Sequence, residues 1–131
     1  FRHWLDMGKK MAKLPKIFHV NWFRTDTQGK FLWPGFGENL RILEWILDRC
    51  NNKVEEAVKT PIGYTPRVTD IDMTGLHLPP GTLERLLAID KKEWLEELKG
   101  IKAFFRQFKK DLPQELWQEY EDLKKRLEFH E

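Results

Sequence analysis

Helical periodicity in the second half of the chain constrains its fold more than any other feature. Apolar residues recur at helical spacing in three stretches, which begin near Thr82, Asp90 and Pro113. Thr82 is a candidate cap of the first stretch, and Asp90-Lys-Lys-Glu matches a capping box that opens the second through Phe108. The sequence therefore predicts a C-terminal half that is mainly α-helical and has no internal repeat.

A fourth helical pattern begins at Asn39 and ends at Asn51-Asn52. Its apolar residues at three-to-four spacing are Leu40, Leu43, Ile46, Leu47 and Cys50, with Ile42 and Trp45 beside them. We expect this stripe to face the core, with Cys50, Trp45 and the preceding Trp33 buried. A shorter amphipathic pattern around Trp4 predicts an opening helix that Pro15 stops.

The residues between these two helices favour extended structure. Residues 17–23 are β-branched and aromatic, which predicts a core strand buried on both faces. Residues 25–29 are turn formers, residues 30–33 suggest a short second strand, residues 34–37 form a loop, and residues 60–66 read as extended. The predicted fold class is mixed α/β and helix-rich, with a few strands and a helical C-terminal half.

Composition excludes several classes of function. The chain has 131 residues and a formal net charge of +2, with 23 basic and 21 acidic side chains. Such a weak field argues against nucleic acid or an anionic membrane as partner, and no apolar run is long enough to span a membrane. A single cysteine favours a reducing compartment, so we expect a cytoplasmic protein. The start at Phe1, without initiator Met or cap, suggests a fragment.

An aromatic segment followed by a glycine loop is the most informative feature for function. Residues 21–24 and 30–39 place aromatic rings on a strand end and a loop, with Asn39 at a helix start. Flat rings stack on bases, and a carboxamide can donate to guanine O6 and accept from a ring N–H, a pattern that adenine reverses. Strand aromatics are nevertheless more often core residues, and Asn39 is more often a simple N-cap. From the residues alone, both interpretations stay open.

Four ordered segments make the chain resemble a known family. They are residues 13–24, residues 29–39, Thr60-Pro-Ile-Gly-Tyr-Thr-Pro66 and Asp111-Leu-Pro113. In this order they resemble the C-terminal end of the GTP-dependent phosphoenolpyruvate carboxykinases. The resemblance covers nearly the whole chain. It implies the C-terminal portion of the carboxykinase nucleotide-binding domain, divided into a guanine-binding strand-loop-helix (1–50), an extended connection (51–81) and a helical tail (82–131).

The resemblance also implies site residues. The positions matching Phe23 and Phe36 sandwich the guanine ring, the one matching Phe31 contacts its edge, and the one matching Asn39 hydrogen-bonds it. The expected guanine-binding set is Phe23, Phe31, Phe36, Gly37, Glu38 and Asn39. Catalytic residues, the phosphate-binding loop and the manganese or magnesium ligands precede this segment in the family, so we expect none here. His3, His19, His77 and His130 have no metal-ligand spacing.

The implied activity is that of a lyase. The family decarboxylates oxaloacetate and transfers the GTP γ-phosphoryl group, which gives phosphoenolpyruvate, GDP and carbon dioxide in gluconeogenesis. The resemblance implies guanine nucleotide and the remainder of the carboxykinase chain as partners, a monomeric intact enzyme, and an isolated fragment without turnover. The alternative is a non-enzymatic module whose aromatic side chains bind another protein or a single strand of nucleic acid.

Overall fold

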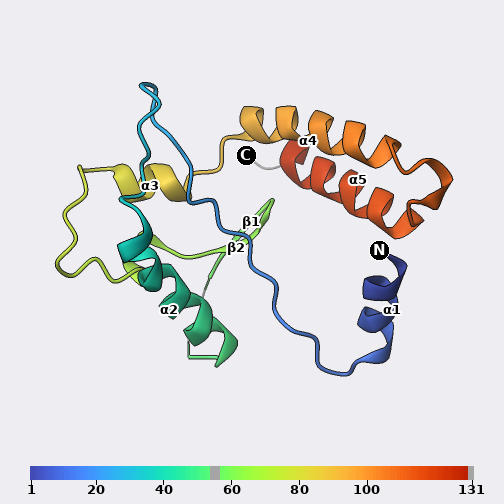
Figure 1. Ribbon diagram of the computed structural model, residues 1–131, viewed down its shortest axis with the longest axis horizontal. Helices are drawn as coiled ribbons and strands as arrows, with labels where there is room; N and C mark the ends of the chain where they lie inside the picture. The colour runs from blue at the N-terminus through green and yellow to red at the C-terminus, as the bar shows by residue number, and fades with distance from the viewer. Residues whose placement is uncertain (54–56, 130–131) are drawn as a thin grey trace. The chain divides into compact units, whose positions relative to one another are not determined.

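The computed structural model describes residues 1–53 and 57–129 (Figure 1). Its elements in chain order are α1 (Arg2–Lys10), the 3₁₀ helix η1 (Phe36–Glu38), α2 (Asn39–Cys50), β1 (Val58–Thr60), β2 (Gly63–Thr65), η2 (Val68–Asp70), α3 (Thr82–Leu87), α4 (Lys91–Arg106), η3 (Lys109–Asp111) and α5 (Gln114–Phe129). The mixed, helix-rich fold class is confirmed, because helices dominate beside one small sheet.

These elements group into two compact units. Phe1–Pro15 and Ile89–Glu131 form the helical unit, and Lys16–Ala88 form the loop-rich unit. The division into 1–50, 51–81 and 82–131 stays a prediction.

The helical unit is built on the pairing of α4 with α5, which run side by side in Figure 1. Leu98, Tyr120 and Leu127 are its buried core. The carboxylate of Asp90 accepts from the Glu93 backbone N–H at 2.9 Å, as the capping pattern predicts. In the same unit, Arg2 and Lys9 of α1 form ion pairs with Glu115 of α5.

Those two cations and a backbone hydrogen bond also act on the charge of Glu115. Its own backbone N–H and then the Lys9 ammonium are the main causes that lower the pKa of this carboxyl. Since the side chains are exposed, the pairs add little stability.

The aromatic residues of the helical unit pack on one another. Phe105 meets Trp117 edge to face with ring centroids 5.5 Å apart, and Phe108 meets Phe104 at 5.1 Å and Phe1 at 5.2 Å. This edge-to-face geometry is favourable for aromatic pairs. Each ring has a packing partner within its own unit, although Phe1 and Phe104 remain 53% and 49% exposed.

The core of the loop-rich unit lies beneath one face of α2. Trp45, Ile71 and Leu83 are buried together, and the half-buried residues packed on them are Phe18, Ile42, Ile46, Ala57, Met73, Leu86 and Leu87. The predicted bounds of α2 are confirmed, and so is the burial of Trp33 and Trp45, which are 5% and 6% exposed.

The predicted buried stripe of α2 is confirmed for Ile42, Trp45 and Ile46, which pack on the core, and is wrong for the other residues. Leu40, Leu43 and Leu47 are 73%, 43% and 61% exposed, and Cys50 is exposed as well. This helix has two apolar faces, and the one that carries the large indole of Trp45 packs on the core. Cys50 is the last residue of the helix and lies outside that core cluster.

The predicted core strand over residues 17–23 is also wrong. Residues 17–21 form no regular element, and Trp22 and Phe23 lie in a turn. Burial alternates along the segment, with Phe18, Val20 and Trp22 half-buried and the residues between them exposed, so only one side of it is packed. The suggested strand over 30–33 is reduced to a single antiparallel bridge between Thr25 and Phe31.

The remaining elements follow the sequence more closely. The extended prediction over residues 60–66 corresponds to the antiparallel pair β1–β2, in which Val58 faces Thr65 and Thr60 faces Gly63. The opening helix α1 ends at Lys10, before the predicted stop. Thr82 is not a cap: Gly81 holds that position with a left-handed φ of 76°, and Thr82 is the first, buried residue of α3.

Candidate functional site

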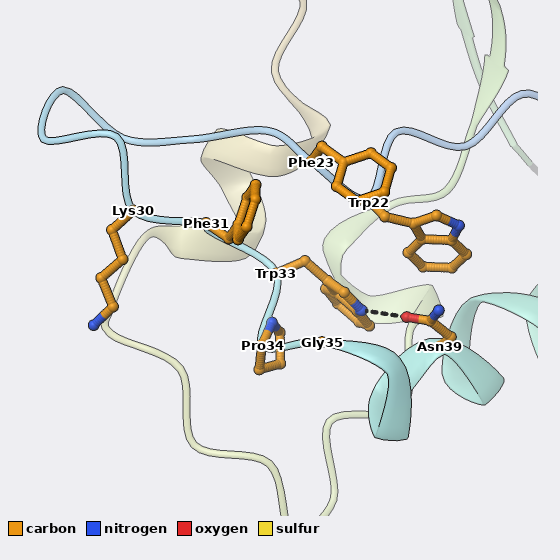
Figure 2. A pocket seen from close by; sticks show the side chains of 8 residues that line it. All are labelled: Trp22, Phe23, Lys30, Phe31, Trp33, Pro34, Gly35 and Asn39. Carbon is orange, nitrogen blue, oxygen red and sulfur yellow. Dashed lines mark hydrogen bonds between the residues drawn. The ribbon is translucent and has the colours of Figure 1, made fainter.

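An apolar cavity of about 410 Å³ lies in the loop-rich unit (Figure 2). The residues that line it are Trp22, Phe23, Lys30, Phe31, Trp33, Pro34, Gly35 and Asn39. They come from the residues directly before the turn over 25–29, the residues directly after it, and the first residue of α2. Ligand pockets for small molecules are typically of this size or larger, roughly 300–1,000 Å³.

A hydrogen-bonded turn brings the two halves of the aromatic segment together. The Asp26 carboxylate accepts from the backbone N–H groups of Gln28 at 2.8 Å and Lys30 at 3.0 Å. The Leu32 N–H donates to the Arg24 carbonyl at 2.9 Å. These bonds close the predicted turn over residues 25–29 and place Phe31 opposite Thr25.

The same bonds act on the charge of Asp26. The Lys30 backbone N–H and then that of Gln28 lower the pKa of this carboxyl, because both stabilise its ionised form. The turn is further held to the end of α3, where the Arg24 guanidinium donates to the carbonyls of Leu86 at 3.2 Å and Ala88 at 2.8 Å.

Phe23 and Phe31 form an exposed aromatic pair at the cavity. Their ring centroids are 6.0 Å apart with planes at 62°. Their side chains are 72% and 58% exposed, so neither is a core residue. The Asn21 side chain accepts from the Phe23 backbone N–H at 2.9 Å, which fixes the backbone where Phe23 begins. The cavity thus holds large aromatic faces in contact with solvent.

Asn39 is positioned by a buried tryptophan. The indole Nε1–H of Trp33 donates to Asn39 Oδ1 at 2.8 Å, which Figure 2 draws as a dashed line. Glu38 holds the N-cap position of α2, and Asn39 is the first residue of the helix. The N-cap interpretation of Asn39 is therefore wrong, and its carboxamide lines the cavity instead.

Three of the expected site residues do not line this cavity. Phe36, Gly37 and Glu38 form η1, directly after the lining residue Gly35. The Phe36 side chain is 91% exposed. Gly35 has a φ of 123°, a value that residues with a Cβ rarely adopt, so glycine allows the chain to enter η1 here.

The Glu38 carboxylate forms an ion pair with Arg41 of α2. It accepts from Arg41 Nε at 2.6 Å, and the same guanidinium donates to the carbonyls of Asp72 at 2.7 Å and Thr74 at 3.0 Å. Glu38 therefore stabilises the start of α2 through Arg41. The side chain and backbone N–H of Thr74 lower the pKa of Asp72 in this loop.

The structure adds lining residues that sequence reasoning did not assign to the site. The expected guanine-binding set does not include five residues that line the cavity, namely Trp22, Lys30, Trp33, Pro34 and Gly35. A usable signal in the sequence is the alternation of apolar and polar residues from Phe18 to Trp22, which places Trp22 on the packed side with Phe18 and Val20. No comparable pattern in the sequence predicts the contact from Trp33 to Asn39, which lies six residues further along the chain.

Among residues 1–53 and 57–129, no three His, Cys, Asp or Glu side chains gather closely enough to hold a metal ion. The donor set that a divalent cation would need is thus not found in this part of the chain. Across the same ranges, the helices are too short or too polar to cross a bilayer. His130 lies outside the described residues.

The aromatic rings and the single carboxamide define a candidate site for a flat heteroaromatic ligand. Comparison with known proteins gives the family. The profile described as "Phosphoenolpyruvate carboxykinase C-terminal P-loop domain" matches residues 1–126, and the chain belongs to this family.

Curated relatives extend this match. The chain is 44% identical over 128 residues to the phosphoenolpyruvate carboxykinase [GTP] of Chlamydia pneumoniae, which covers 97% of this chain and 21% of that protein. The protein of the same name from Neocallimastix frontalis is 46% identical over 129 residues, covering 97% and 21%. That of Ascaris suum is 44% identical over 127 residues, covering 96% and 19%. The chain therefore spans about a fifth of the length of these relatives.

Proposed function

We propose that this chain supplies the guanine-binding part of a GTP-dependent phosphoenolpyruvate carboxykinase. The observation that carries the proposal is one cavity lined by Phe23, Phe31 and the carboxamide of Asn39. Exposed aromatic faces offer stacking energy of about 1–3 kcal/mol per base, and the carboxamide supplies the polar contact that distinguishes purines. Family membership over residues 1–126 supports the same interpretation.

In this proposal the base enters between two phenyl rings. Phe23 supplies one face and Phe31 an edge, and both border the cavity. Phe36 supplies the opposite face: its 91% exposed side chain has no packing to lose when it turns onto a base. Gly37 and Glu38 serve the geometry of η1, with Glu38 acting through Arg41.

The reaction of the whole enzyme is part of the proposal. Oxaloacetate is decarboxylated and the γ-phosphoryl group of GTP is transferred to the resulting enolate, giving phosphoenolpyruvate, GDP and carbon dioxide in cytoplasmic gluconeogenesis. The bound manganese or magnesium ion of the intact, monomeric enzyme would neutralise charge during this transfer. The chain described here would bind and orient the base, and it would have no turnover alone.

Titration of the chain with GDP and ADP by calorimetry tests the binding proposal. We expect GDP to bind at least about tenfold more tightly than ADP, since one well-placed hydrogen bond distinguishes them. Equal affinity for the two nucleotides, or no binding of either, would contradict it. An assay with oxaloacetate, GTP and manganese checks the second part, where turnover above a buffer blank would contradict the expected inactivity.

A protein-binding role has one observation in its favour. Leu40, Leu43 and Leu47 form an exposed apolar stripe along α2. Within the main proposal this stripe packs against the remainder of the carboxykinase chain, and in the alternative it binds a separate protein. GDP titration separates the two, because a module that only binds proteins would respond to neither nucleotide.

A further inference from the structure

We infer that Trp33 is a positioning residue that makes the site selective for guanine over adenine, by fixing which side of the Asn39 carboxamide faces the ligand. This inference rests on the proposed function and deepens it. A carboxamide has an acceptor oxygen and a donor nitrogen of almost equal size. An unrestrained asparagine could therefore rotate by half a turn and satisfy either purine.

The indole of Trp33 removes this freedom. An indole Nε1–H donates and never accepts, so it can bond only to the oxygen of Asn39. The observed distance of 2.8 Å is that of a good hydrogen bond. Trp33 is 5% exposed, so its ring is held by packing, and reversal of Asn39 would leave a buried donor unpaired.

The consequence is a fixed donor at the cavity. With the oxygen directed to Trp33, the carboxamide nitrogen is turned away from the indole, as Figure 2 shows. An N–H group suits the O6 acceptor of guanine, whereas the N6 amino group of adenine would meet donor with donor. Selectivity therefore depends on a residue whose N–H is bonded to Asn39.

Substitution of Trp33 by Phe tests this directly. The variant keeps a flat apolar ring but lacks the N–H, so Asn39 can turn its oxygen to the ligand. We expect GDP to bind more weakly, ADP to bind more tightly, and the ratio of their dissociation constants to fall about tenfold. A ring that served only packing would weaken both nucleotides in parallel and leave the ratio unchanged.

Trp45 provides the matched control. It is 6% exposed in the core of the same unit, and its indole N–H has no hydrogen-bond partner among the described residues. Trp45→Phe makes the same chemical change outside the cavity, so the ratio of GDP to ADP affinity should stay at the wild-type value. A fall equal to that of Trp33→Phe would overturn the inference, because general loosening would explain both.

A double-mutant cycle locates the effect at Asn39. We expect Asn39→Ala to lose the preference for GDP over ADP. Adding Trp33→Phe to that variant should not change the ratio of the two dissociation constants any further. If the wild-type chain does not prefer GDP over ADP, or if Asn39→Ala keeps the preference, the proposed base contact is wrong. The inference about Trp33 is then wrong as well. If Asn39→Ala loses selectivity but Trp33→Phe retains it, the proposed function stands and this inference alone is overturned.

A second measurement needs no variant and covers the case in which Trp33→Phe does not fold. Solvent exchange of the indole N–H protons can be followed by NMR in the wild-type chain. Trp33 and Trp45 are equally buried, so the bonded proton of Trp33 should exchange more slowly, and GDP should slow it further while ADP does not. Exchange of Trp33 as fast as that of Trp45, with no response to GDP, would overturn the inference.

Discussion

The two units use aromatic side chains in opposite ways. In the helical unit, Phe105 and Trp117 pair edge to face and Phe104 packs on Phe108. In the loop-rich unit, Phe23 and Phe31 are held by a hydrogen-bonded turn yet remain more than half exposed. Exposure alone does not mark a ligand site, because Phe129 in the helical unit is 82% exposed. Phe23 and Phe31 differ in that their exposed rings also line a cavity, which points to a ligand.

The largest effect we expect comes from the core of the helical unit. Leu127 is 1% exposed, and Leu127→Ala should lower the free energy of unfolding by about 2–5 kcal/mol through lost burial and the cavity left behind. Leu47→Ala on α2, at a leucine that is 61% exposed, is the control and should cost little. Urea unfolding followed by circular dichroism measures the free energy of unfolding of both variants. Equal decreases in the two variants would contradict the expected difference between a buried and an exposed leucine.

The next effect concerns binding rather than stability. Phe23→Ala should weaken GDP binding by roughly tenfold to a hundredfold, because one stacking face is removed. Its unfolding free energy should change by less than about 1 kcal/mol, because the ring is 72% exposed.

Phe129, which is 82% exposed in the helical unit, is the matched control for Phe23. Phe129→Ala should leave the dissociation constant for GDP unchanged in calorimetry. If Phe23→Ala destabilised the chain without weakening GDP binding, the Phe23 ring would serve packing alone. The contrast between the two units would then disappear.

A smaller effect should come from the loop that leads into η1. Gly35 has a φ of 123°, and a Cβ there would meet no atom within 4 Å, so Gly35→Ala acts through backbone strain alone. Strain of about 1–3 kcal/mol should weaken GDP binding several-fold or more, as calorimetry would measure. Gly100→Ala in the middle of α4 is the control, where alanine favours the helix and GDP affinity should not change.

The smallest effect we expect is a dependence of GDP affinity on pH. The Asp26 pKa is lowered from its ordinary value of 3.8, so the charged carboxylate stabilises the turn above that pH, and this stabilisation is lost as the pH falls through the lowered pKa. We expect GDP affinity to fall by less than about fivefold over this acidic range.

The Asp26→Asn variant isolates the contribution of Asp26 to this pH dependence, because asparagine keeps an acceptor but does not titrate. The ratio of wild-type to variant affinity, measured at each pH, should be flat near neutrality and fall only at acidic pH. A ratio that changes near neutral pH would assign the titration to another group.

Local patterns predicted the elements that depend on local rules. The N-cap at Asp90, the bounds of α2 and the helices after Thr82 and Pro113 follow from propensity, caps and proline chemistry. The strand predicted over residues 17–23 is wrong because composition does not tell whether an apolar segment has a neighbouring strand to pair with. The exposure of Cys50 was missed because α2 has two apolar faces, and periodicity cannot choose between them.

The candidate site was predictable only where it depends on local sequence rules or on the family resemblance. The turn chemistry at Asp26 and the glycine at position 35 are visible in the sequence, and the family resemblance selects Phe23, Phe31 and Asn39, which line the cavity. The hydrogen bond from Trp33 to Asn39 and that from Arg41 to Glu38 are properties of side-chain orientation. Spacing does not encode such orientation, so these contacts needed the three-dimensional structure.

The measurement that tests the central claim most directly is an NMR experiment on the chain with bound GDP. Nuclear Overhauser effects between the guanine H8 proton and aromatic ring protons report which rings contact the base. We predict contacts to Phe23, Phe31 and Phe36, with none to the leucines of the α2 stripe. Guanine contacts confined to that stripe, or absent from all three phenylalanines, would contradict the account.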